Sequence, residues 1–113
     1  MLSLGVRPSQ SGVMSLVDFV RFRVSPSRAH SLLAARSGAI DALRSRPGFR
    51  AAYLVELERG EWLDVMVWDG DEAAAESFKT GMDLPAVAAY TDLMAEVLGE
   101  ERGVLIDGDV LGG

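Results

Sequence analysis

Apolar side chains recur at every second position in several stretches of the chain, a spacing that places them on one face of a β-strand. This alternation predicts four strands, and Arg59-Gly60 between the second and third is a typical hairpin turn. The predicted strands cover residues 13–24, 49–58, 61–69 and 104–111.

An apolar spacing of three to four residues predicts helices in the remaining segments. We expect the first helix to begin at Ser25 and Pro26, with the Ser25 side chain as its cap, and to end before Gly48. Its expected apolar stripe consists of Ala29, Leu33, Ile40 and Leu43, with Leu32 and Ala39 beside it.

The second helical region is predicted in two parts. Asp69 or Asp71 caps a short helix that runs to about Lys79. Asp83 caps the next helix, which we expect to end at Gly99. The apolar stripe expected to pack this helix against the core consists of Val87, Tyr90, Met94 and Val97.

The strand at residues 61–69 is apolar on both faces. One face carries Leu63, Val65 and Val67, and the other carries Trp62, Met66 and Trp68, with Asp64 as the only charge in this apolar stretch. A sheet with one face in water alternates apolar and polar positions. Both faces of this strand therefore need cover.

The predicted order is strand, helix, strand, strand, two-part helix, strand. This order is typical of the α+β ferredoxin-like split βαβ fold, with a four-stranded antiparallel sheet and helices on one face. The second face needs another layer, and a second copy of the chain is the simplest one. We therefore expect a homodimer through the sheet faces. We also expect one domain at residues 13–111, preceded by a flexible arm at residues 1–12.

Several short motifs in this order resemble the antibiotic biosynthesis monooxygenase family over residues 14–111. They are Arg46-Pro47-Gly48-Phe49, the hairpin that follows, Val65-Met66-Val67-Trp68 and Asp71-Glu72-Ala73. The resemblance implies a dimeric α/β barrel in which each subunit has a pocket between sheet and helices. Members of this family include cofactor-free monooxygenases that oxidise aromatic polyketides, haem-degrading enzymes, quinol oxygenases and many proteins with no known activity, so the resemblance leaves the activity open.

Haem degradation, another activity of the family, is not expected. The haem degraders use an Asn, a Trp and a His, and the corresponding positions hold Val20, Ser77 or Phe78, and a residue between Val87 and Tyr90. The chain has no Asn, so it also lacks one of the polar residues that line the pocket in the polyketide oxidisers of this family. The strand-ending Trp of the family does match, at Trp68.

Three residues are candidates for catalysis. Asp64 and Asp18 are charges on otherwise apolar strand faces, and Tyr90 lies on an apolar helix stripe. A carboxylate in an apolar site can acquire a raised pKa and act as a general base toward a phenol. The alternative is structural: each Asp pairs with an Arg such as Arg21, Arg23 or Arg50, and Tyr90 makes a buried hydrogen bond.

Aromatic and thioether side chains are candidates for binding a planar substrate, and core or interface packing is the alternative for them. The candidates are Trp68, Trp62, Phe22, Phe78 and Met94, and Tyr53 faces either the pocket or the barrel. Two functions follow: a cofactor-independent monooxygenase of a small phenol or quinol, or a non-catalytic small-molecule-binding or structural dimer.

The amino-acid composition disfavours several classes of binding partner. The 113 residues carry a net charge of −6, with eight Arg against two acids in residues 1–50 and fifteen acids against three bases thereafter. An acidic chain without aromatic residues among its arginines is not typical of nucleic-acid binding. Without Cys, and with a single, exposed-looking His30, we expect no metal and no cofactor. No apolar run spans a bilayer, so we expect no membrane partner. Residues 1–12 do not resemble a secretory signal and the absence of Cys fits a reducing compartment, so we expect a cytoplasmic protein.

Overall fold

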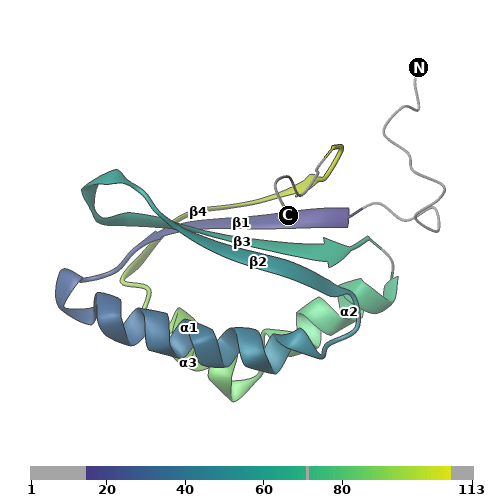
Figure 1. The fold of residues 1–113 in the computed structure, drawn as a ribbon, viewed down its shortest axis with the longest axis horizontal. Coiled ribbons are helices and arrows are strands. Elements are labelled where there is room, and N and C mark those ends of the chain that lie inside the picture. The colour runs from purple at the N-terminus through teal and green to yellow at the C-terminus, as the bar shows by residue number, and fades with distance from the viewer. Residues whose placement is uncertain (1–14, 71, 108–113) are drawn as a thin grey trace, which may run out of the picture.

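The computed structural model describes residues 15–70 and 72–107. Strands and helices in these residues follow the order β1–α1–β2–β3–α2–α3–β4 (Figure 1). The predicted arm at residues 1–12 lies outside the described residues. The elements are β1 (Ser15–Arg23), α1 (Ala29–Arg44), β2 (Phe49–Glu56), β3 (Glu61–Asp69), α2 (Glu72–Gly81), α3 (Pro85–Thr91) and β4 (Glu96–Val104).

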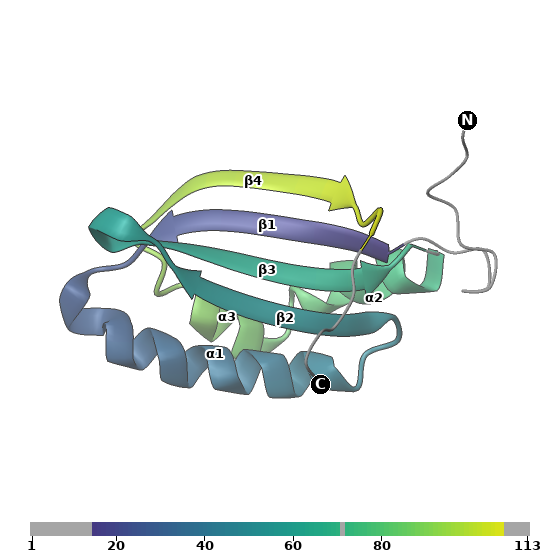
Figure 2. The ribbon, with the colours of Figure 1, turned by 45° about the horizontal axis from the view of Figure 1, so that its top comes forward.

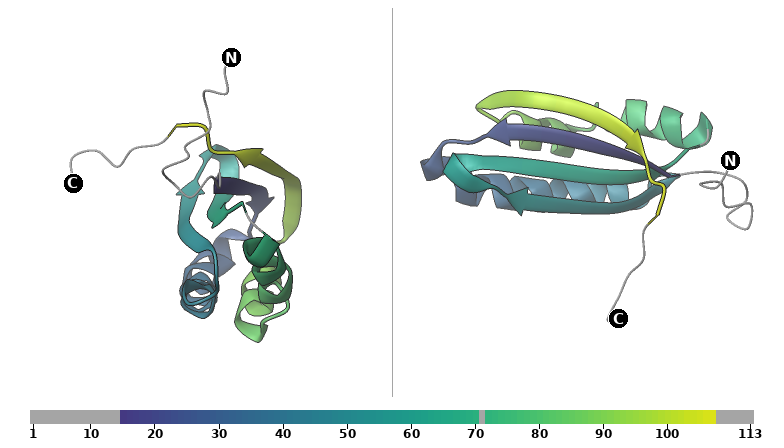
Figure 3. Two further views of the ribbon diagram at one scale, coloured as in Figure 1. Left: turned by 90° about the vertical axis from the view of Figure 1, so that its right-hand side faces the viewer. Right: turned by 90° about the horizontal axis from the view of Figure 1, so that it is seen from above.

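The strands form one antiparallel sheet in the order β2-β3-β1-β4 (Figure 2). Seen end-on, all three helices lie on the same side of this sheet (Figure 3). The predicted α+β ferredoxin-like fold is therefore confirmed. The hairpin between β2 and β3 is confirmed too, with Arg59 and Gly60 both at positive φ, 62° and 76°.

The buried face of α1 is rotated by about one position from the predicted stripe. Leu32, Ala39 and Leu43 are fully buried, whereas Leu33 is 48% exposed. Both sets of residues recur at helical spacing, so the sequence pattern alone favours neither face. The Ser25 side chain makes no cap; instead its backbone carbonyl accepts a hydrogen bond from the Arg28 N–H at 2.8 Å, within a short 3-10 turn before α1.

The prediction for the C-terminal region is wrong in its boundaries. Helix α3 ends at Thr91, its N-cap is Leu84 rather than Asp83, and Gly99 lies inside β4. Of the predicted strand at residues 104–111, Val104 belongs to β4, and residues 108–111 lie outside the described residues.

The pairing of β4 explains this difference. Strand β1 has a second edge whose backbone groups need partners, and β4 supplies them, beginning where the Ala95 N–H donates to the Arg23 carbonyl at 2.8 Å. A seven-residue helix has little stability of its own, so this tertiary pairing outweighs the local apolar spacing that predicted a longer one.

The two faces of β3 have different surroundings. Trp62, Asp64 and Trp68 are buried on the face that the helices cover. On the opposite face the cross-strand register aligns Phe19, Val65 and Tyr53, and Tyr53 is 56% exposed. The described helices thus leave an apolar sheet face uncovered, as the two-sided pattern of this strand predicted.

Gly48, in the turn between α1 and β2, allows α2 to approach closely, and Gly48→Ala should lower the free energy of unfolding by about 3 kcal/mol. Its φ is +84°, and an added Cβ would overlap the Cβ of Ala74. The left-handed conformation costs Ala roughly 1–2 kcal/mol and overpacking adds roughly 1–3 kcal/mol. Urea unfolding measures the loss.

Gly60→Ala is the matched control, because Gly60 also has a positive φ but no atom within 4 Å of an added Cβ. It should cost only about 1 kcal/mol. Equal losses in the two variants would contradict the close packing of α2 against Gly48.

Candidate functional site

A buried polar cluster lies between the sheet and helices α1 and α3. Its centre is Asp64 in β3, which is 3% exposed and faces the helices between Trp62 and Met66. The hydroxyl of Tyr90, from α3, donates a hydrogen bond to Asp64 Oδ2, and Tyr90 is 1% exposed. Two of the three predicted catalytic residues therefore meet in one site.

Arg36 of α1 completes this cluster. Its Nη2 lies 3.4 Å from Asp64 Oδ1, and its Nε lies 3.5 Å from Asp64 Oδ2. Its side chain is 14% exposed. Both carboxylate oxygens of Asp64 thus have partners, and the Arg36–Asp64–Tyr90 cluster balances its buried negative charge.

Local periodicity brings these three groups together. Asp64 points toward the helices because alternate residues of β3 share a face. Arg36 follows Leu32 by four residues and precedes Ala39 by three, which places it on the buried side of α1. Tyr90 follows Val87 by three residues on the buried side of α3.

The environment keeps Tyr90 protonated and makes it a hydrogen-bond donor. Burial raises the pKa of Tyr90 well above its usual range, and the neighbouring charge of Asp64 raises it further. Tyr90 therefore keeps its proton at neutral pH and donates it in the hydrogen bond to Asp64. The rings of Phe22 and Tyr90 pack edge to face, with centroids 6.5 Å apart and an angle of 89° between the ring planes. This packing holds the tyrosine ring in place.

Asp18, the third predicted catalytic residue, belongs to a different cluster. Its carboxylate accepts hydrogen bonds from Arg102 of β4, at 2.6 Å from Nε and 3.3 Å from Nη2. The Arg102 guanidinium also lies over the ring of Phe78, 5.0 Å from its centroid. The Asp18 site is the more open one, since the Arg102 side chain is 48% exposed.

The predicted binding residues form a packed aromatic core on the same side of the sheet. Trp68 is 2% exposed and meets Phe49 and Phe78 edge-on, with ring centroids 5.0 Å and 5.5 Å away. Trp62 and Phe22 are buried in the same core, and Met94 packs against it. These residues therefore pack as a core in this structure, which is the structural alternative to binding a substrate.

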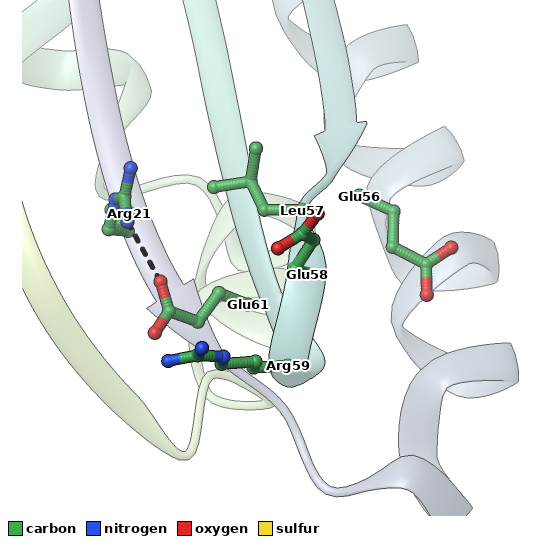
Figure 4. A pocket seen from close by; sticks show the side chains of 6 residues that line it. All are labelled: Arg21, Glu56, Leu57, Glu58, Arg59 and Glu61. Atoms are coloured by element: carbon green, nitrogen blue, oxygen red, sulfur yellow. Dashed lines mark hydrogen bonds and ion pairs between the residues drawn. The ribbon is translucent and has the colours of Figure 1, made fainter.

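A surface depression lies elsewhere, at the β2–β3 hairpin (Figure 4). Glu61 in this depression pairs with Arg21 at 2.8 Å and with Arg23 at 2.9 Å. The hydrogen bond from Arg23 lowers the pKa of the Glu61 carboxyl, and Arg21 adds to this effect. The depression is lined by Arg21, Glu56, Leu57, Glu58, Arg59 and Glu61.

The arginines that pair with buried Asp64 and half-buried Asp18 differ from the examples expected from the sequence, which are Arg21, Arg23 and Arg50. Asp64 pairs with Arg36, and Asp18 pairs with Arg102. Arg21 and Arg23 pair with Glu61, and Arg50 pairs with Asp69. The signal for Arg36 was its position on the same side of α1 as Leu32.

No group of three His, Cys, Asp or Glu side chains suited to a metal ion occurs among residues 15–70 and 72–107. His30 is exposed on α1. Over the same part of the chain, no helix has the length and apolar character needed to cross a membrane.

No protein-family model matches the chain, and its sequence matches no curated protein. Solved structures do match. A candidate antibiotic biosynthesis monooxygenase from Chloroflexus aurantiacus is 20% identical with a TM-score of 0.66, over 87% of this chain and 99% of that one. The chain has the fold of the antibiotic biosynthesis monooxygenases.

Two further structures share this fold. SnoaB, a cofactor-independent oxygenase from Streptomyces nogalater, is 18% identical with a TM-score of 0.57, over 88% of this chain and 98% of that one. A protein of unknown function from Nitrosomonas europaea is 17% identical with a TM-score of 0.64, over 88% and 97% of the two chains. The match thus extends over nearly the whole length of each neighbour.

Proposed function

We propose that the chain is a cofactor-independent monooxygenase acting on a small aromatic phenol or quinol, with Asp64 as the proton acceptor. The observation that carries the proposal is the buried Arg36–Asp64–Tyr90 cluster. Ionisable groups in a domain core are costly, and they concentrate at sites where a reaction uses them. The fold shared with SnoaB, a cofactor-independent oxygenase, supports the same function.

The reaction needs a base and an electron-rich substrate. The substrate hydroxyl donates a hydrogen bond to the Asp64 carboxylate beside the Tyr90 hydroxyl and gives up its proton there. Arg36 holds the carboxylate in position, and the resulting phenolate reacts directly with dioxygen. One oxygen atom forms a new C=O group on the ring, and the other leaves as water with the two hydrogens the substrate loses.

Oxygen consumption tests this proposal, using hydroxyanthrones and quinols as candidate substrates. We expect uptake above the spontaneous rate with at least one of them, and a reduced rate for Tyr90→Phe, which removes the hydroxyl that donates to Asp64. His30→Ala is a control, because His30 is exposed and outside the cluster. Uptake that survives unchanged in both Tyr90→Phe and Trp68→Phe would remove these two residues from the mechanism.

A second candidate function is non-catalytic binding of a small molecule, or a structural role. The observation that favours it is the complete pairing of Asp64 by Arg36 and Tyr90, which leaves no carboxylate oxygen without a partner. Absence of oxygen uptake across the panel, with binding of a panel compound detected by tryptophan fluorescence, would favour this second function.

A second copy of the chain is the proposed cover for the apolar sheet face that carries Phe19, Tyr53 and Val65. Light scattering should then give about 24 kDa, twice the 12.1 kDa of the chain. Val65→Asp should give the monomer mass, because it places a charge at the centre of that face. Leu33→Asp, on the exposed side of α1, is the control and should keep the mass of the dimer. A wild-type mass of about 12 kDa would exclude the dimer.

A further inference from the structure

Helix α2 contributes less to the core than the other two helices. Its buried side chains, among those the structure describes, are Ala74 and Ser77, and Phe78 is partly buried. By contrast, α1 buries Leu32 and Leu43 completely. The free energy gained on burial grows with the apolar area, so detaching α2 from the sheet costs less than detaching α1.

The contact between α2 and its surroundings leaves polar atoms unsatisfied. Three buried side-chain atoms of the described residues have no hydrogen-bond partner, namely Arg46 Nε, Trp68 Nε1 and Ser77 Oγ. Ser77 belongs to α2, and Arg46 hydrogen-bonds to the same helix. The indole of Trp68 packs against Phe78 of α2, with ring centroids 5.5 Å apart. Unpartnered buried groups cost free energy, so they weaken the packed position of α2.

Arg46, in the turn between α1 and β2, reaches the C-terminal end of α2. Its Nη2 donates to the hydroxyl of Thr80 and to the carbonyl of Ser77, the latter at 3.4 Å. The C-terminal end of a helix carries a partial negative charge, so a guanidinium there is stabilising. Arg46 therefore fastens one end of a helix that buries little apolar surface.

Arg102, in β4, fastens α2 at a second point. Its guanidinium lies over the ring of Phe78, 5.0 Å from the ring centroid. Asp18 of β1 accepts two hydrogen bonds from this guanidinium, at 2.6 Å and 3.3 Å, and thereby fixes its position. Two arginines from other parts of the fold thus hold α2 against the sheet.

The buried Arg36–Asp64–Tyr90 cluster needs an opening before it can meet a molecule from solvent. Asp64 is 3% exposed and Tyr90 is 1% exposed. Helices α1 and α3 pack against each other, and each contributes a residue to the cluster, so moving either of them breaks it. Helix α2 lies at the end of the helix layer, packs against β2 and β3, and contributes nothing to the cluster (Figure 2). It is therefore the helix that can move while the cluster stays intact.

We propose that α2 is a lid, held shut by Arg46 and Arg102, whose opening gives small molecules access to the helix-covered side of the sheet. Lids are drawn from the least stable parts of a fold, and α2 has the sparse burial and unsatisfied groups expected of one. The proposal goes beyond the proposed function, because a binding protein needs the same opening as an oxygenase.

The chain has no Cys, so a single introduced thiol reports on this opening. Ser77→Cys places a thiol on the buried side of α2 with little change in volume. Val87→Cys is the matched control in α3, because Val87 is 2% exposed. The reaction of each thiol with dithionitrobenzoate is timed in the native and the urea-unfolded chain, and urea titration gives the global stability of each variant. The Val87→Cys thiol should react only through global unfolding, and the Ser77→Cys thiol at least about tenfold faster than global unfolding allows.

Thr80→Val, added to Ser77→Cys, tests the Arg46 contact. It keeps the shape of the side chain but removes the hydroxyl that accepts from Arg46, so the thiol should react about tenfold faster. Thr91→Val is the matched control, since the Thr91 hydroxyl donates to the Ala88 carbonyl within α3. It should leave the rate within about twofold. A Ser77→Cys thiol that reacts no faster than global unfolding allows, or a rate that Thr80→Val leaves unchanged, would overturn the proposal.

Amide hydrogen exchange of the wild-type chain repeats the test without an introduced thiol. After correction for intrinsic rates, the amides of α2 should exchange at least about tenfold faster than those of α1. Equal protection of the two helices would overturn the lid. Both measurements use the chain without substrate, so their outcome is separate from that of the oxygen-uptake assay.

Discussion

Arg36→Ala should lower the free energy of unfolding by about 3 kcal/mol, because it leaves the carboxylate of Asp64 in the core without its cation. Breaking a buried pair from one side typically costs roughly 3–5 kcal/mol. The lower end applies here, since the Arg36 nitrogens lie 3.4–3.5 Å from the carboxylate oxygens and the Arg36 side chain is 14% exposed. Urea unfolding followed by tryptophan fluorescence measures the change.

Arg44→Ala is the matched control on the same helix. Arg44 pairs with Asp41 at 3.6 Å, but both side chains are more than 70% exposed, so the loss should stay within about 0.5 kcal/mol. A loss below about 1 kcal/mol for Arg36→Ala would mean that water or a shifted side chain replaces the guanidinium, and the cluster would then not be a closed ion pair.

Asp64→Asn should lower kcat for oxygen uptake by roughly a hundredfold to ten-thousandfold, the range typical of losing a positioned general base. The amide keeps the size of the side chain and one acceptor for the Tyr90 hydroxyl, but it cannot take the substrate proton at neutral pH. The rate is measured with the panel substrate that gives the fastest uptake by the wild-type chain.

Asp41→Asn is the control for this second variant, because Asp41 is an exposed acid of α1 whose loss changes the net charge equally. It should leave kcat within about twofold of wild type. If Asp64→Asn is folded and retains the full rate, the proton acceptor lies elsewhere, and Asp64 then serves only the structure.

The fold follows from patterns that the sequence displays locally. Strand β3 is apolar on both faces, and Gly48 and Gly60 mark a helix end and a turn, so the order of elements as far as α2 was predictable. The error came at β4. The spacing of Val87, Tyr90, Met94 and Val97 continues past the true helix end, and only the pairing with β1 terminates it.

The candidate site was predictable in part for the same reason. Asp64 and Tyr90 stand out as polar groups in apolar patterns, and the structure joins them. Arg36 was overlooked because an arginine on a helix is ordinarily solvated, although it lies in register with buried Leu32 and Ala39. The Asp18–Arg102 pair depends on the register of β4, which the sequence pattern misplaced.

Incorporation of isotopic oxygen tests the central claim most directly. With ¹⁸O₂ and a substrate that supports uptake, we expect one ¹⁸O atom per product molecule from the wild-type chain, and less product from Asp64→Asn. Mass spectrometry of the product measures both. Product that carries oxygen from water only, or no oxygenated product from any substrate in the panel, would contradict the monooxygenase.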